Sequence, residues 1–118
     1  MNIIKLVINN KELDLKLENN TTTKDLIEKL DKGTIELQVD DYGGFEKVGT
    51  LPLALTREDK NQTSKNGDVM LYQGNKLVIF TDSNTWSYSK IGELDLSNIE
   101  NLEETLGAGE QKVILKKS

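Results

Sequence analysis

The sequence predicts a small closed or nearly closed β-barrel of antiparallel strands, with a helix plugging each end. Three observations support this fold class. Short apolar runs along the chain indicate about seven or eight strands, and only two segments have the features of short helices. The connections between these segments are mostly short. At 118 residues, without an internal repeat or a linker, the chain is expected to form one domain over residues 1–118.

Residues 3–17, "IIKLVINNKELDLKL", predict a β-hairpin. Leucines alternate with charged residues in its second half, and Asn9-Asn10 can supply the positive φ of a tight turn. A helix is predicted over residues 21–33, where Thr22 and Asp25 resemble a capping box. A hairpin followed by a helix also fits a ubiquitin-like β-grasp. We rank that fold second because most of the chain and another helix then follow.

Residues 34–55 predict a strand, a sharp turn and a second strand. Apolar and polar residues alternate in "TIELQVDD", which is typical of a half-buried strand. Gly43-Gly44 suits a turn or bulge because positive φ costs glycine nothing. Phe45 and Val48 are then expected to pack inward. Pro52 is expected to end the second strand because it cannot donate to a ladder.

Residues 57–68, "REDKNQTSKNGD", contain no apolar residue and are expected to form an exposed loop. Asp68 at its end is expected to cap backbone amides in a turn. Residues 68–72 and 76–81 flank a short turn with Gly74 at its tip, which predicts a hairpin. Both strands are apolar at nearly every position, so we expect both of their faces to be covered.

The C-terminal part predicts a strand over residues 86–96, a helix within 97–109 and a last strand over 111–117. Ser97–Glu100 has the pattern of a capping box, and a glycine follows the apolar stripe of the helix. Trp86 is expected to serve in packing.

The composition excludes several kinds of function. The net charge is −5, and 14 of the 15 basic residues are lysines, so the chain lacks the basic field of a nucleic-acid-binding protein. The sequence has no cysteine and no histidine. This removes disulfides, Cys/His zinc sites, haem and iron–sulfur ligation, thiol nucleophiles and imidazole-based triads. We therefore expect no cofactor.

The first residues, "MNIIKLVINNKELDL", have neither a long apolar stretch nor a small-residue cleavage site, so they do not resemble a signal peptide. No window approaches the roughly 18 apolar residues of a membrane span. We expect a soluble, cytoplasmic protein without a membrane partner. The oligomeric state is left open.

Three segments resemble the bacterial and archaeal cyclophilin-like domain family: "GGFEKVGTLPLAL", "NGDVMLYQGNKLVIFTD" and "SYSKIGEL", followed by a short helix and a last strand. The likeness covers nearly the whole chain. Its most specific parts are Glu46-Lys47 with Gly49, Leu51-Pro52, and Gly67-Asp68 with Leu71-Tyr72.

This resemblance implies a closed eight-stranded antiparallel barrel, like that of cyclophilin, with a short helix at each end. It implies little about function, because the family is largely uncharacterised. Cyclophilins that isomerise prolyl bonds use an arginine beside a groove with Phe, Met, His and Trp, and this chain lacks the segments that carry them. Arg57 is its sole arginine. No catalytic residue is carried over, because a shared fold is not a shared site.

Four residues are candidate ligand-binding side chains: Glu46, Lys47, Tyr72 and Tyr88. Glu46 and Lys47 would line a groove with Tyr42 as a flat contact. Neighbours on a strand point to opposite faces, so one of the two is expected to be an internal salt-bridge partner. Tyr72 and Tyr88 place their hydroxyls in one cavity if their strands are adjacent, and are otherwise core rings with wet tips. For the whole segment around Glu46, we rank a purely structural corner ahead of this ligand-binding role.

No metal site is expected. Asp59, Asn61 and Thr63 stand at alternate positions, as in a calcium loop. The sixth position of that loop is serine rather than glycine, and the twelfth is methionine rather than glutamate, so we reject it.

Three functions stay open. The first is a non-catalytic binding module that holds a small molecule or a peptide, which we favour because the residue inventory suits binding better than catalysis. The second is a divergent prolyl isomerase, in which Arg57 would be the one available electrophile. The third is a structural or protein-interaction domain.

Overall fold

The computed structural model describes residues 2–44 and 46–118. Their elements, in chain order, are β1 (Ile3–Ile8), β2 (Lys11–Leu17), α1 (Thr21–Leu30), β3 (Ile35–Tyr42), β4 (Glu46–Thr50), β5 (Lys60–Thr63), β6 (Asp68–Tyr72), β7 (Lys76–Phe80), β8 (Thr85–Leu94), α2 (Leu102–Leu106) and β9 (Gln111–Lys117).

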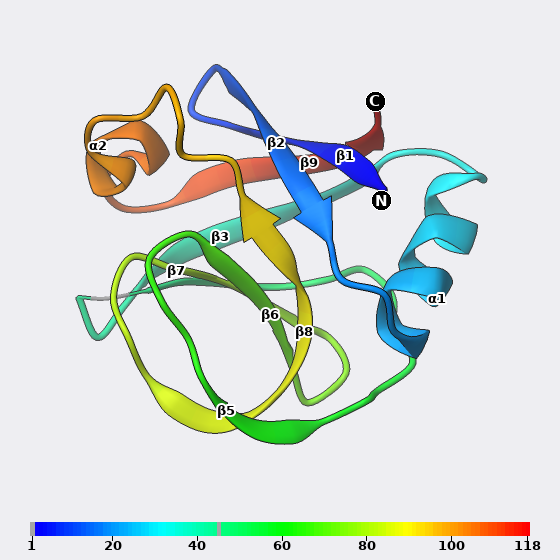
Figure 1. Ribbon diagram of the computed structural model, residues 1–118. Coiled ribbons are helices and arrows are strands. Elements are labelled where there is room, and N and C mark those ends of the chain that lie inside the picture. The colour runs from blue at the N-terminus through cyan, green and yellow to red at the C-terminus, as the bar shows by residue number, and fades with distance from the viewer. Residues whose placement is uncertain (1, 45) are drawn as a thin grey trace.

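Eight of these strands close into a barrel. They pair in the order β2-β1-β9-β3-β4-β7-β6-β8, and β8 returns to β2 through pairs such as Leu15 with Leu94. Every pairing is antiparallel. The predicted closed eight-stranded antiparallel barrel is therefore confirmed, and the β-grasp alternative is wrong (Figure 1).

Two glycines let neighbouring strands of the barrel approach closely: Gly49 between β4 and β3, and Gly92 at the β8–β2 pairing that closes the barrel. A Cβ on Gly49 would lie 2.1 Å from the carbonyl oxygen of Gln38 on β3. A Cβ on Gly92 would lie 2.2 Å from the carbonyl oxygen of Lys16 on β2. Any larger residue at either position would push neighbouring strands apart, so these two glycines are needed for closure.

The two helices lie on opposite sides of the barrel (Figure 1). Leucines from both of them join the barrel core, which confirms the predicted helical plugs. Their starts differ from the predictions: the side chains of Asn20 and Asn101 cap α1 and α2, by accepting from the N–H groups of Thr23 and Glu104. Asparagine is as good an N-cap residue as serine or threonine, so its side chain can accept a hydrogen bond from a free N–H group at the start of each helix. Neither helix in the described residues is long and apolar enough to cross a membrane.

The segment predicted as an exposed loop, residues 57–68, contains strand β5. It pairs with the first part of β8, from Lys60 opposite Tyr88 to Thr63 opposite Thr85. We call this two-stranded unit the β5–β8 ribbon, and it lies at the bottom of Figure 1. The sequence pattern fails here because the strand is polar throughout. Backbone hydrogen bonds to β8 hold it without an apolar face.

The apolar side chains form two clusters on opposite faces of the same strands. Val69, Leu71, Leu77 and Ile79 belong to the large cluster that fills the barrel. The alternate side chains of β6, β7 and β8 form a smaller cluster outside it: Met70, Val78, Phe80 and Tyr88. Both faces of β6 and β7 are largely buried, as predicted: the inner side chains join the barrel core, and the outer ones cluster with Tyr88 of β8.

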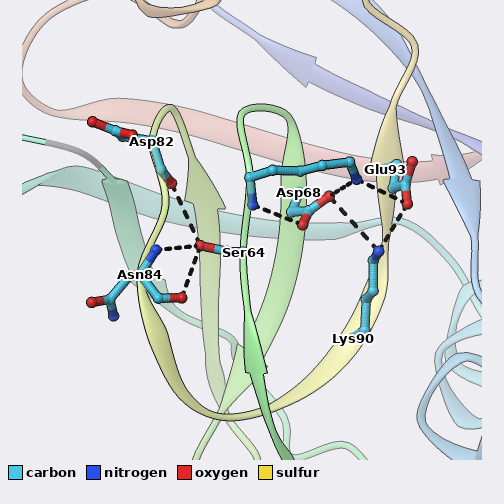
Figure 2. Close-up of polar contacts among 7 residues, drawn as sticks. Ser64, Asp68, Asp82, Asn84, Lys90 and Glu93 are labelled. Atoms are coloured by element: carbon cyan, nitrogen blue, oxygen red, sulfur yellow. Dashed lines mark hydrogen bonds and ion pairs between the residues drawn. The ribbon is translucent and has the colours of Figure 1, made fainter.

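A charged network fixes the turn before β6 to β8 (Figure 2). Asp68 is 2% exposed and accepts from the backbone N–H of Lys65 at 3.0 Å and from its Nζ at 2.8 Å. The Nζ of Lys90 lies 3.8 Å from Asp68 and 2.8 Å from Glu93. Asp68 therefore caps a backbone amide in the turn, as predicted.

Candidate functional site

A groove of about 410 Å³ lies on the outer face of the barrel, between β4, β6 and β7 and the β5–β8 ribbon. Apolar and aromatic side chains form its floor: Val48, Val78, Tyr72 and Tyr88. Two exposed aromatic residues and three polar residues complete its lining: Tyr42, Trp86, Glu46, Lys76 and Asn84. The groove brings together three of the four predicted site residues.

Strand register explains why these side chains meet. Tyr42 of β3 lies opposite Glu46 of β4, Val48 lies opposite Val78 of β7, and Tyr72 of β6 lies opposite Lys76 of β7. Side chains two residues apart on a strand share a face, so each strand presents its even-numbered residues to the groove.

The floor of the groove is built around Tyr88, which is 4% exposed. Its ring meets Phe80 edge-on, with centroids 5.5 Å apart, and Tyr72 in the same manner at 6.1 Å. Such T-shaped pairs are a favoured geometry of aromatic rings. The floor is therefore pre-formed rather than assembled by a ligand.

Asn84 ties the floor to the ribbon. Its Nδ2 donates to the Tyr88 hydroxyl at 2.7 Å. Its own backbone is held by Ser64, whose Oγ accepts from the Asn84 N–H at 3.0 Å and lies within hydrogen-bond distance of the carbonyls of Asp82 and Asn84 (Figure 2). The polar tip of Tyr88 is thus anchored while its ring faces the groove.

Glu46 is the one acidic side chain in the lining. It is half-buried, and its Oε2 has no hydrogen-bond partner in the described part of the chain. Burial raises the pKa of this carboxyl group above its usual value. Burial also raises the pKa of the Tyr88 phenol; the hydrogen bond from Asn84 opposes that shift, and the negative charge of Glu46 adds to it.

Lys47 does not face the groove. It lies opposite Ile79, a residue of the barrel interior, and is 3% exposed. Its Nζ donates to Asp41 Oδ1 at 2.7 Å and to the Gly109 carbonyl at 2.6 Å. The prediction that one member of the Glu46–Lys47 pair is an internal salt-bridge partner is confirmed, and Lys47 is that member.

Sequence reasoning missed part of the lining. Trp86, expected in packing, is 56% exposed and lines the groove. Tyr42, expected as a flat contact of the groove, does line it and is 66% exposed. Nothing in the sequence pattern marked Lys76 or Asn84 as groove residues. Lys76 reaches the groove through strand pairing, and Asn84 through the turn before β8. The prediction that Val48 packs inward is wrong: it shares the outer face of β4 with Glu46, and there it packs, partly buried, against the outer cluster. Phe45 lies outside the described residues.

Two other features are less suited to a ligand. Arg57 pairs with Asp59, its Nε lying 2.8 Å from Oδ2, and its side chain lies over Gly74 in the β6–β7 turn. A hollow of about 400 Å³ beside the β1–β2 hairpin is lined mainly by polar groups, and Lys5 and Asp14 within it pair with each other. The aromatic groove is therefore the candidate site.

Comparison with solved structures shows a related fold. The structure is similar to the solution structure of the hypothetical protein AF2241 from Archaeoglobus fulgidus, with a TM-score of 0.70 and 16% sequence identity. The similarity covers 99% of this chain and 95% of the other. At this identity the likeness shows the fold alone. No curated protein matches the sequence.

Comparison with protein families agrees with this fold. Residues 6–116, from β1 to β9, match the Cyclophilin-like family. The matched span contains the whole groove and the two glycines that close the barrel. The resemblance drawn from the sequence is confirmed: this chain belongs to the Cyclophilin-like family.

Proposed function

We propose that this protein is a binding module that holds a small molecule or a short peptide in the aromatic groove. The observation that carries the proposal is the convergence of Glu46, Tyr72 and Tyr88 on one groove with two exposed aromatic residues. A volume of about 410 Å³ falls in the range of ligand pockets. Apolar walls with a few placed polar groups are the usual composition of such sites.

The exposed aromatic residues add to this support. Tyr42 and Trp86 are two of only three large hydrophobic residues left exposed among the described residues, and both line the groove. Exposed aromatic side chains gathered at one place mark interaction sites, because each offers a large rigid surface together with a polar group.

Trp86 provides the test, because it is the sole tryptophan and lines the groove. We expect compounds from a metabolite and peptide library that raise the melting temperature to change Trp86 fluorescence as well. Tyr42→Ala should weaken their binding about tenfold, by loss of one stacked ring. Ile3→Ala, which removes an exposed apolar side chain on β1 outside the groove, is the matched control and should leave binding unchanged. No stabilisation across the library, or equal binding by both variants, would overturn the proposal.

The geometry does not favour the prolyl isomerase alternative. Its one candidate electrophile, Arg57, is held by Asp59 over the β6–β7 turn. The groove instead offers a carboxylate, a lysine and aromatic rings.

A further inference from the structure

The two charged side chains of the groove are of opposite sign. Glu46 has no ion-pair partner in the described part of the chain, and Lys76 likewise takes no part in its ion pairs. Lys47, the cation nearest to Glu46 in the sequence, is committed to Asp41 on the other face of β4. A ligand is therefore the available source of a counter-charge for both groove residues.

The charges stand at opposite ends of the groove. Lys76 lies opposite Thr50, which is four residues beyond Glu46 on β4. At about 3.3 Å per residue the two backbone positions are separated by roughly 13 Å along the strand. The pair of Val48 and Val78 lies between them, so the middle of the groove is apolar.

The surroundings of Glu46 suit a cation in particular. Tyr42 lies directly opposite Glu46 on the neighbouring strand, and its exposed ring lines the same groove. An ammonium or guanidinium group next to an aromatic face gains a cation–π contact in addition to the ion pair. A half-buried carboxylate without a partner also carries a desolvation cost that such a group would remove.

We propose that the groove recognises a small zwitterion with an apolar middle, its cationic group against Glu46 and Tyr42 and its anionic group against Lys76. This inference rests on the groove being the binding site. The separation of the two protein charges favours ligands whose charges are several bonds apart, such as an ω-amino acid or a short peptide. An α-amino acid, whose charges flank one carbon atom, is too short to meet both.

Four probes of simple chemistry test the proposal: 6-aminohexanoate, hexylamine, hexanoate and glycine. Each is titrated into the full chain, with Trp86 fluorescence and backbone amide chemical shifts as readouts. We expect 6-aminohexanoate to bind best and to shift amides along β4 and β7. Losing the ammonium group, in hexanoate, should weaken binding about tenfold, the size of one charge-assisted hydrogen bond. Losing the carboxylate, in hexylamine, should weaken it about threefold, because ordering the long side chain of Lys76 offsets part of the ion pair.

Two variants assign the ends. Glu46→Gln should remove the preference for 6-aminohexanoate over hexanoate. Lys76→Met should remove the preference for 6-aminohexanoate over hexylamine. If Glu46→Gln fails to fold, Tyr42→Ala replaces it and should lower the affinity for hexylamine more than that for hexanoate.

The outcomes separate this inference from the proposed function. If hexylamine or hexanoate bound as tightly as 6-aminohexanoate, the proposal that the ligand is a zwitterion would be overturned. Neutral library compounds binding in the groove while all four probes fail would also overturn it, yet leave the binding function standing. Failure of the probes and the library together would overturn both.

Discussion

Asp68 and Glu46 are two carboxylates removed from water in different ways. Asp68 is 2% exposed and is surrounded by donors, with the backbone N–H and Nζ of Lys65 at 3.0 and 2.8 Å and the Nζ of Lys90 at 3.8 Å. Glu46 is half-buried, and its Oε2 has no hydrogen-bond partner in the described residues.

The difference separates a structural charge from a candidate functional one. A buried charge that is fully paired holds its surroundings together, and removing it leaves its partners uncompensated. A charge without partners adds nothing to the fold and carries a desolvation cost. Such a residue is expected where a ligand completes the site, because local rules of stability are broken mainly at functional positions.

The largest effect is expected at Asp68. Asp68→Ala should lower the free energy of unfolding by about 3 kcal/mol, because Lys65 and Lys90 lose the buried one of their two shared partners and the turn before β6 loses its cap. Urea unfolding measures the loss. The control is Glu93→Gln in the same network: its side chain is 44% exposed, and its removal should cost less than about 1 kcal/mol. Both carboxylates are ion-paired, so equal costs for the two variants would mean that the burial of Asp68 adds nothing to its structural role.

Lys47 sharpens the comparison, because it adjoins Glu46 in the sequence but pairs its charge with Asp41. Lys47→Met should cost about 2 kcal/mol, chiefly from the lost charge-assisted hydrogen bond between the buried Nζ of Lys47 and the Gly109 carbonyl. Binding in the groove should be unchanged, as followed by Trp86 fluorescence. A variant that loses ligand affinity while keeping its stability would place Lys47 in the binding site after all.

The pH dependence of this variant follows from Asp41. The hydrogen bond from Lys47, followed by that from the Gly109 N–H, lowers the pKa of Asp41. A carboxyl group with a lowered folded-state pKa contributes stability above its unfolded pKa, and this contribution is lost as the pH falls through the folded value. The stability difference between wild type and Lys47→Met should therefore shrink in acid.

The barrel was predictable because most of its strands carry an apolar face. Alternation in β2 and β3 and the continuous apolar runs of β6 and β7 report the burial that the fold requires. β5 was missed because its burial is slight and its stability comes from pairing with β8, a partner more than twenty residues away. Local sequence does not report such a pairing.

The site was predictable only in part, for the same reason. Because side chains alternate along a strand, the sequence alone predicts that Glu46 and Lys47 point to opposite faces. That Tyr72 and Tyr88 meet depends on the pairing of β6 with β8 and on the bulge near Met70, which shifts the register between those strands. Trp86 lies on the part of β8 that pairs with β5 instead of β6, two residues before Tyr88, so its place in the groove also depends on a pairing between distant segments.

The smallest effect, and the one of opposite sign, is expected at Glu46. Burial raises the pKa of Glu46 in the folded state, so the folded protein holds this proton more tightly than the unfolded chain does. Wild type therefore loses stability as the pH rises from the unfolded pKa through the folded one.

Glu46→Gln removes that loss and should raise the free energy of unfolding at pH 7 by about 1 kcal/mol or less, because one side of the carboxylate meets solvent in the groove. Below the unfolded pKa the two proteins should be equally stable. Urea unfolding at about pH 3.5 and at about pH 7, which lie on either side of the usual pKa of glutamate, measures the change. A variant that is less stable than wild type at pH 7 would mean that Glu46 is compensated within the fold like Asp68, and the contrast between the two carboxylates would be lost.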